Sequence, residues 1–269
     1  MDNRAVGVFD SGLGGLTTVK KLLEFLPGDD IIYLGDTGRV PYGSRSRETI
    51  IKYASQDAAF LAGFDIKAMI VACNTVCGVA FDVLDAAYGM PVFEVVTAPA
   101  DAAAAATRNG KVGVIGTFAT IRSGAYEAAI HRSAPGATIY SEPCPLFVHL
   151  VENGRISADD IAALAIAEDY LIPLRDAGVD TLILGCTHYP LLRGVISKVM
   201  GPGVALIDSG AETAKFIAGY LRGHDMLPRP GRAGTVKYFV TDSTEEFSLH
   251  ASRFMEMDVL GMVEQIELE

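Results

Sequence analysis

The chain of 269 residues lacks two features that would direct it to nucleic acid or to a membrane. It has no basic block: 22 Lys and Arg stand against 33 Asp and Glu, so the formal net charge is −11. No apolar run approaches the ~20 residues that cross a bilayer. We therefore expect no nucleic-acid partner and no membrane partner, because nothing neutralises phosphates. A small acidic substrate stays possible, since a binding site needs only a few local donors.

Cysteine is also scarce, and the four residues are Cys73, Cys77, Cys144 and Cys186. The first four residues lead directly into a strand-like run, so no signal peptide is evident. We therefore expect a cytoplasmic protein whose thiols stay reduced. Reduced thiols are buried and inert, bound to metal, or catalytic, and the surrounding sequence has to discriminate among these states.

What the sequence contains is a regular alternation of apolar, strand-length runs with segments of helical spacing. Strands are predicted at residues 5–9, 31–34, 68–72, 91–96, 112–115, 138–140, 181–184, 204–207 and 236–240. Helices are predicted at residues 16–26, 48–63, 79–88, 98–107, 124–132, 158–177, 191–199 and 212–222. Because the strands are apolar on both faces, this order predicts an α/β fold with mainly parallel sheets flanked by helices.

The two halves of the chain echo each other. Residues 7–10 and 113–116 both read as a strand that runs into a Gly- and Thr-rich turn, and Cys73 and Cys186 follow at corresponding places. The echo predicts two similar domains with a cleft between them; a chance likeness of common strand–helix patterns is the alternative. We assign residues 1–97 plus 208–269 to the N-terminal domain and residues 98–207 to the second domain.

Polar residues follow several predicted strands, and ligands of open α/β sheets bind beyond the carboxyl ends of strands. The segment DSGLGG at residues 10–15 opens a helix whose N-terminus attracts an anion. Its glycines match neither a Walker loop nor a dinucleotide fingerprint, and a tight turn capped by Asp10 or Ser11 is the alternative. Residues 41–43, PYG, can present backbone N–H groups to a carboxylate, or form a plain surface turn.

Cys73 and Cys186 each end an apolar run and are followed at once by polar residues, 74–75 and 187–188. A place at a strand end beside a helix N-terminus lowers the pKa of a thiol. One such cysteine is usually a small core residue. Two in matched contexts favour a functional pair.

Two other uses of these thiols stay open. A metal site could combine Cys73, Cys77, Cys186 and His188, although structural zinc usually has two closely spaced ligand pairs. Cys186 could be a nucleophile with His188 as its base. These two side chains would point the same way only if the strand continued, and Pro190 argues against that, so we expect them to diverge.

Three further residues have weaker signals. Cys144 stands between two prolines and is predicted to be structural. Glu152 lies between an apolar stretch and a turn, and can polarise an imidazole such as His188. His149 reads as an ordinary surface or helix residue.

Taken in order, these segments resemble the glutamate racemases of the aspartate/glutamate racemase superfamily. The matching pieces are FDSGLGG at 9–15, PYG at 41–43, ACNT at 72–75, a Gly-Thr pair with a second Thr at 116–120, and LGCTHYP at 184–190. The resemblance covers about residues 5 to 225, and DSG together with PYG points to the glutamate branch.

The resemblance implies two α/β domains with the active site in the cleft between them. It implies interconversion of L- and D-glutamate by two acid/base thiols, without pyridoxal phosphate, metal or nucleotide, to supply D-glutamate for peptidoglycan. A homodimer is the expected assembly. The implied catalytic residues are Cys73, Cys186, Asp10, His188 and Glu152. The implied substrate-binding residues are Asp10, Ser11, Pro41, Tyr42, Gly43, Asn74, Thr75, Thr117, Thr187 and His188.

Two alternatives remain: a racemase for aspartate or another amino acid, and, in a different class, a thiol redox or metal-binding protein. The decisive expectation is geometric. The sulfurs of Cys73 and Cys186 should line opposite walls of one cleft.

Overall fold

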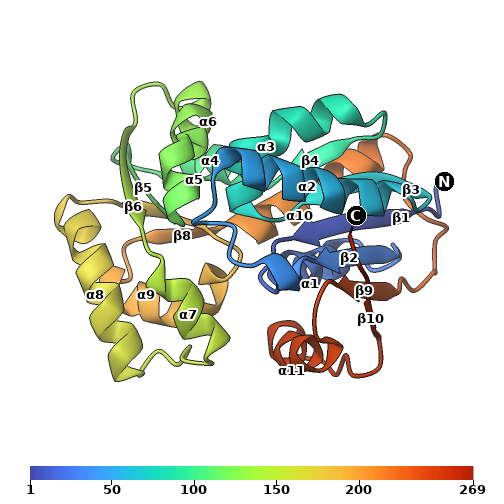
Figure 1. Ribbon diagram of the computed structural model, residues 1–269. Coiled ribbons are helices and arrows are strands. Elements are labelled where there is room, and N and C mark those ends of the chain that lie inside the picture. Colours follow the sequence, from blue (N-terminus) through green and yellow to red (C-terminus); the bar gives the residue numbers. More distant parts are fainter. Residues whose placement is uncertain (269) are drawn as a thin grey trace.

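The computed structural model describes residues 1–268 and contains two β-sheets with helices on both faces (Figure 1). The strands are β1 Ala5–Asp10, β2 Ile31–Gly35, β3 Ile66–Val71, β4 Val92–Glu94, β5 Lys111–Gly116, β6 Thr138–Pro143, β7 Thr181–Gly185, β8 Ala205–Asp208, β9 Val236–Val240 and β10 Val263–Gln265. The helices are α1 Leu16–Phe25, η1 Thr37–Arg39, α2 Arg47–Ala62, α3 Asn74–Ala87, α4 Thr97–Ala106, α5 Phe118–Ser123, α6 Ala125–Ser133, α7 Leu146–Glu152, α8 Ile161–Asp176, η2 Tyr189–Leu192, α9 Arg193–Met200, α10 Ser209–Gly223 and α11 Thr244–Met255.

The two sheets repeat one topology. The first has the order β10-β9-β2-β1-β3-β4 and the second has the order β6-β5-β7-β8. All of these strand pairs are parallel, which confirms the predicted fold class. The shared order makes β1 equivalent to β5 and β3 equivalent to β7. Cys73 and Cys186 follow β3 and β7, so the two thiols occupy equivalent places in the two halves.

The strands are buried on both faces because helices cover both faces. Along β3, Ala68 and Ile70 pack into the core that includes α1 and α10, whereas Met69 and Val71 pack into the core that includes α2 and α3. All four side chains are fully buried. Each large apolar side chain buried in this way contributes about 1.5–3 kcal/mol to stability, so continuous apolar runs favour this layered arrangement.

The chain passes from the first sheet to the second through α4 and returns through α10, and these two helices pack against each other. Figure 1 shows α10 between the two sheets, where it also contacts α1 and β7. Residues that follow the carboxyl ends of strands in both sheets line one common pocket.

Apart from the short 3₁₀ helices η1 and η2, four elements within residues 1–268 were not predicted by the sequence patterns: α5, α7, α11 and β10. Helices α5 and α7 are short, at 6 and 7 residues, which is too few for a helical period to be evident. The other two lie in the tail, whose polarity is mixed; β10 pairs in parallel with β9 and extends the first sheet. Across residues 1–268, no helix combines the length and the apolar character needed to cross a membrane.

A buried lysine ties the tail to the first sheet. Nζ of Lys67, at the start of β3, donates hydrogen bonds to the backbone oxygens of Met226 at 2.7 Å and Asp2 at 3.1 Å. It also forms an ion pair with Asp29, and both side chains are almost completely buried. This one ammonium group therefore joins the N-terminus, β3 and the segment that precedes β9.

We predict that Lys67→Met destabilises the protein by about 3–5 kcal/mol, because it leaves a buried carboxylate and two carbonyl groups without their partner. The measurement is the free energy of unfolding from a urea titration. The control is Lys21→Met, which removes an exposed ion pair with Glu24 and should cost less than about 1 kcal/mol. Equal losses in the two variants would contradict the anchoring role of Lys67.

Candidate active site

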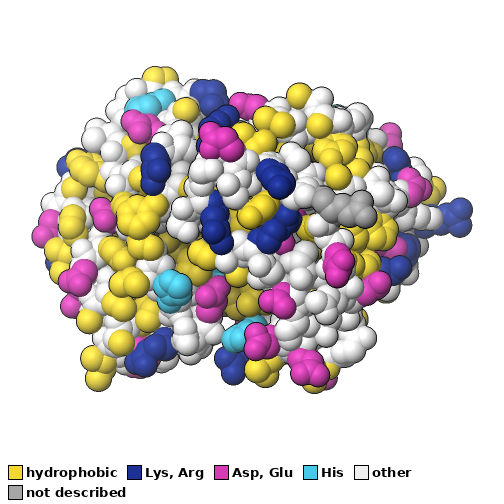
Figure 2. Space-filling view, viewed as in Figure 1, with side chains coloured by type: hydrophobic (Ala, Val, Ile, Leu, Met, Phe, Trp, Pro, Cys, Tyr) yellow, Lys and Arg dark blue, Asp and Glu magenta, His cyan; other side chains and the backbone are white. Residues whose placement is uncertain are grey.

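A pocket of about 300 Å³ lies where the loops that follow the strands of both sheets meet, a size typical of a small-molecule site. In Figure 2 the surface is notched near its lower edge, and hydrophobic, acidic and histidine side chains gather around this notch. The lining residues are Ser11, Gly12, Leu13, Val40, Pro41, Tyr42, Gly43, Ser44, Cys73, Asn74, Thr75, Thr117, Phe118, Pro145, Val148, His149, Glu152, Cys186, Thr187 and His188.

Two loops from opposite sheets touch beside this pocket. A Cβ atom at Gly14, in the β1–α1 loop, would lie 2.0 Å from Oγ1 of Thr187 and 2.6 Å from Nδ1 of His188. The hydroxyl of Thr17 donates a hydrogen bond to the backbone oxygen of Thr187 at 2.9 Å. This close approach requires a glycine at position 14 because any side chain would push the loops apart.

Cys73 lies at the N-cap of α3 and is 5% exposed. Its thiol donates a hydrogen bond to Oγ of Ser11 over 3.5 Å. Burial, with a further contribution from the negative charge of Asp10, raises the pKa of Cys73 to about 12. The expectation that the helix N-terminus lowers this pKa is therefore wrong, because desolvation and the nearby carboxylate outweigh the helix dipole.

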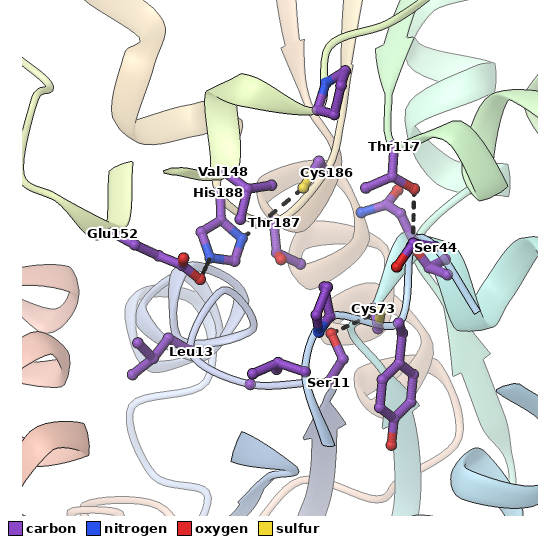
Figure 3. Close-up of a pocket in the computed structure, with 18 of the residues that line it drawn as sticks. Ser11, Leu13, Ser44, Cys73, Thr117, Val148, Glu152, Cys186, Thr187 and His188 are labelled. Carbon is purple, nitrogen blue, oxygen red and sulfur yellow. Dashed lines mark hydrogen bonds and ion pairs between the residues drawn. The ribbon is translucent and has the colours of Figure 1, made fainter. Parts of the chain in front are cut away.

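Cys186 belongs to a chain of polar contacts on the other side of the pocket (Figure 3). Its Sγ lies 4.0 Å from Nδ1 of His188, and Nε2 of His188 lies 3.4 Å from Oε1 of Glu152. The second contact is an ion pair and not an aligned hydrogen bond. The expected divergence of Cys186 and His188 is wrong because His188 adopts a helical conformation just before η2, so the chain turns immediately after β7.

The imidazole of His188 is poised to carry a proton. Burial alone would lower its pKa, but the contacts with Cys186 and with the carboxylate of Glu152 raise it to about 10. Burial raises the pKa of Glu152, and the His188 contact more than offsets this, so the net pKa of Glu152 is lowered. The His188 ring and the ring of Phe254 of α11 form a T-shaped contact, with the ring centroids 5.8 Å apart.

Asp10 lies behind the pocket wall and does not line the pocket. It is 1% exposed, and its Oδ2 accepts a hydrogen bond from the backbone N–H of Gly12 at 3.0 Å. Within residues 1–268 its Oδ1 has no hydrogen-bond partner. Burial raises the pKa of Asp10, whereas the charge of His188 acts in the opposite direction.

The other residues that the resemblance implies for catalysis or substrate binding all line the pocket. Asn74 and Thr75 begin α3; Oδ1 of Asn74 accepts a hydrogen bond from Tyr126 at 2.5 Å, and Nδ2 of Asn74 has no partner in the described part of the chain. The hydroxyls of Thr75 and Thr117 lie 3.0 Å apart and bridge the two halves across the pocket. Thr117 also caps α5.

One wall of the pocket is represented among the sequence predictions by Glu152 alone. It comes from the segment that contains α7, where Pro145, Val148, His149 and Glu152 line the pocket. Their spacing of three and four residues puts them on one helix face. This period was not recognised in the sequence because α7 is short. His149 is an exposed residue of α7, in agreement with the expectation of a surface or helix residue, and it also lines the pocket. The remaining unpredicted lining residues are Gly12, Leu13, Val40, Ser44 and Phe118.

The metal alternative can be compared directly with the side-chain positions. In the structure as far as residue 268, no three His, Cys, Asp or Glu side chains form a group that could hold a metal ion. Cys77 instead donates its S–H to the backbone oxygen of Val71 over 3.1 Å. Cys144 is fully buried, and its backbone oxygen accepts a hydrogen bond from Tyr189.

Comparison with known proteins identifies relatives along the whole chain. The profile of the family described as Asp/Glu/Hydantoin racemase matches residues 16–217. A glutamate racemase of Geobacter metallireducens is 47% identical over 266 residues, which are 99% of this chain and 97% of that protein. The crystal structure of a glutamate racemase from Bacillus anthracis has a TM-score of 0.95 at 36% identity, covering 100% of this chain and 99% of that one. A glutamate racemase from Francisella tularensis, solved in complex with D-glutamate, has a TM-score of 0.91 at 39% identity, with the same coverage.

We predict that the His188 imidazole remains protonated at pH 8 and that Glu152→Gln lowers its pKa, because the variant removes a negative charge 3.4 Å away. Imidazole titration by ¹⁵N NMR measures this, with the exposed Glu168→Gln as the control. The pKa of about 10 exceeds the ordinary 6.5, so protonated His188 stabilises the fold fully below about pH 6.5 and this contribution is lost as the pH rises through 10. A wild-type value near 6.5 would contradict the ion pair.

Proposed function

This chain belongs to the Asp/Glu/Hydantoin racemase family, and we propose that it interconverts L- and D-glutamate by proton transfer through Cys73 and Cys186. The family resemblance in its sequence is thereby confirmed: the chain is a racemase, and so an isomerase. The substrate and the residue roles are the proposal, and they rest on the pocket geometry together with the activity named for the relatives.

One observation carries the proposal: the two cysteines come from equivalent strand ends of the two sheets and line the same pocket. In Figure 3, Cys186 enters from the side of His188 and Cys73 from the side of Ser11, with the pocket between them. Racemisation at Cα requires one group that removes a proton from one face and another that delivers a proton to the opposite face. Two thiols on opposite walls suit this requirement.

The proposed reaction balances without any further reactant. A thiolate on one wall takes the α-proton, so the Cα–H bond breaks and an S–H bond forms. The thiol on the other wall gives up its proton, so its S–H bond breaks and a new Cα–H bond forms on the opposite face. The enzyme ends with the thiolate on the other wall, ready for the mirror-image substrate or for proton exchange with water.

The α-proton of an amino acid is only very weakly acidic, so its removal by a thiolate needs assistance. The surroundings of the two thiols supply it. His188 and Glu152 form a charged pair beside Cys186, whereas Ser11 and the buried Asp10 lie on the side of Cys73. We propose that His188 assists proton transfer to and from Cys186. We propose that Asp10, which lies behind the pocket wall, adjusts the acidity of the Cys73 thiol through its charge. Both thiols are more than nine-tenths buried, and exclusion of water strengthens these interactions.

The remaining polar groups suit an amino acid with two carboxylates. The hydroxyls of Ser11, Thr75, Thr117 and Thr187 surround the cavity, together with Nδ2 of Asn74, which has no hydrogen-bond partner within residues 1–268. The first turn of α3 adds backbone N–H groups and the positive end of its dipole. The loop of Pro41, Tyr42 and Gly43 closes a further side. Preorganised donors of this kind stabilise a carboxylate whose charge grows as the carbanion develops.

The wider setting is also part of the proposal. We infer that the enzyme supplies D-glutamate for peptidoglycan, works in the cytoplasm and assembles as a homodimer, as the family resemblance implies. We further propose that residues 1–97 with 208–269, and residues 98–207, form two domains. These boundaries fall at the two crossings between the sheets, next to α4 and α10. A racemase for aspartate is the alternative substrate assignment, and a thiol redox protein is the alternative class.

The direct test is incubation of the purified protein with L-glutamate in D₂O without any added cofactor. We expect loss of the α-proton NMR signal and decay of the optical rotation, because each proton transfer exchanges with solvent. L-Aspartate is the control substrate. If aspartate exchanges and glutamate does not, the substrate assignment is wrong; if no amino acid exchanges, the proposed reaction is wrong.

The two-thiol mechanism predicts that Cys73→Ser and Cys186→Ser each lower kcat by at least about a hundredfold, since a hydroxyl is a far weaker acid than a thiol and general acid–base catalysis contributes 10²–10⁴-fold. Cys144→Ser is the matched control because Cys144 is equally buried but does not line the pocket. Steady-state racemisation measures all three variants. Full activity of Cys186→Ser would refute the mechanism while leaving the substrate assignment intact.

A further inference from the structure

Beneath the pocket loop lies a group of polar side chains, partly or fully buried: Asp36, Arg39, Tyr42, Asp57 and Thr241. We call this group the Asp36–Asp57 network. Asp36 and Asp57 are fully buried and Tyr42 is 1% exposed. Asp36 follows β2, Asp57 lies on α2, and Thr241 follows β9, whereas Tyr42 reaches the network from the pocket wall. The network therefore connects the pocket to the first sheet and to the tail.

Asp36 is surrounded by hydrogen-bond donors. Its Oδ2 accepts from Nε of Arg39 at 2.6 Å and from the hydroxyl of Tyr42, and its Oδ1 accepts from Oγ1 of Thr241 at 2.7 Å. Three donors on one carboxyl group are what an ionised carboxylate accepts. Asp36 is therefore the negatively charged member of the network.

Asp57 is placed differently. Its Oδ1 accepts a hydrogen bond from Nη2 of Arg39 at 2.9 Å, and its Oδ2 lies 3.0 Å from the hydroxyl oxygen of Tyr42. The phenol has a single hydrogen, which goes to the nearer oxygen on Asp36. Without a further hydrogen, Oδ2 of Asp57 and the Tyr42 oxygen would face each other with lone pairs only. A proton on Oδ2 converts that contact into a hydrogen bond that Tyr42 accepts.

The charges support the same assignment. Arg39 carries one positive charge, and two ionised carboxylates would leave the buried network with a net negative charge, which is costly in a low-dielectric interior. Within residues 1–268, the groups that face the network include no second cation: Arg39 stacks on the uncharged ring of Tyr53 at 4.3 Å, and Asp10 at the end of β1 adds further negative potential. Burial, together with the charge of Asp36, raises the pKa of Asp57 well above its ordinary value.

We propose that Asp57 retains a proton at neutral pH and uses it to donate a hydrogen bond to the hydroxyl oxygen of Tyr42. Asp57 and Asp36 then act as positioning residues for the Pro41–Gly43 loop. Neither carboxyl group lines the pocket. Their effect on the reaction passes through Tyr42, whose ring is held from behind by two hydrogen bonds. The retained proton is independent of the proposed function, but its importance for substrate binding rests on it.

The first test is spectroscopic and needs no activity. In protein labelled with ¹³C at the aspartate carboxyl carbons, we expect Asp57 to give a resonance with the chemical shift of a protonated acid at pH 7. This resonance should disappear in Asp57→Asn and remain in Asp82→Asn, a matched change at an exposed position of α3. The assignment would be overturned if the wild type lacked the resonance of a protonated acid. It would also be overturned if this resonance disappeared in Asp36→Asn but not in Asp57→Asn.

The second test separates KM from kcat. Asp57→Asn keeps the network neutral and keeps an N–H donor for Tyr42 and an oxygen for Arg39, so KM for glutamate should rise little. Asp36→Asn removes the charge that balances Arg39, and we expect roughly a tenfold or larger rise in KM with a smaller change in kcat, because a misplaced loop loses substrate orientation. Asp82→Asn should match the wild type.

Equal effects of Asp36→Asn and Asp57→Asn on KM would overturn the proposal. If Asp36→Asn does not fold, comparison of the wild type with Asp57→Asn still decides the protonation state, because the resonance should be present in the first and absent from the second. The two inferences also fail separately. A protonated resonance in a protein that racemises no amino acid would refute the proposed function alone, whereas racemisation without that resonance would refute the retained proton alone.

Discussion

The pocket depends on the contact between two loops that belong to different sheets. Gly14 has no room for a β-carbon because Thr187 and His188 occupy that space, and Thr17 bonds the backbone of Thr187 directly. On the opposite side, the hydroxyls of Thr75 and Thr117 meet at 3.0 Å. With the strand ends drawn this close, two thiols that are far apart in sequence face one small cavity. Anything that separates the loops opens the site to water and removes the basis of its electrostatics.

Much of this arrangement could be predicted from the sequence because it follows from local patterns. Apolar runs that alternate with helical spacing sufficed for the parallel sheets, and the repeated strand–cysteine pattern corresponds to the equivalence of β3 and β7. The pocket lining also follows the motifs: of the residues proposed for the site, all but Asp10 contact the cavity. These features depend on one segment at a time, which is why sequence patterns reveal them.

What escaped prediction depends on contacts between distant segments. The proximity of Cys186 and His188 arises from a turn that no strand pattern contains. The high pKa of Cys73 comes from its burial and from Asp10, 63 residues earlier in the sequence, and not from its own helix. The tail offered no motif, yet Thr241 reaches Asp36 and Phe254 meets the His188 ring. Burial and long-range partners decide such properties, and they exist only in the folded chain.

The two thiols occupy equivalent places but have unlike neighbours, and thermodynamics limits what that difference can do. Mirror-image amino acids have the same free energy in water, so the equilibrium constant of a racemisation is one. By the Haldane relation, kcat/KM must then be identical for the two enantiomers, however different their pathways. A charged imidazole on one wall and a buried carboxyl group behind the other can make one enantiomer bind more tightly, but only if that enantiomer turns over more slowly in the same proportion. In the proposed two-thiol mechanism, the asymmetry of the walls would therefore redistribute the enzyme between its two protonation forms without favouring either direction of the reaction.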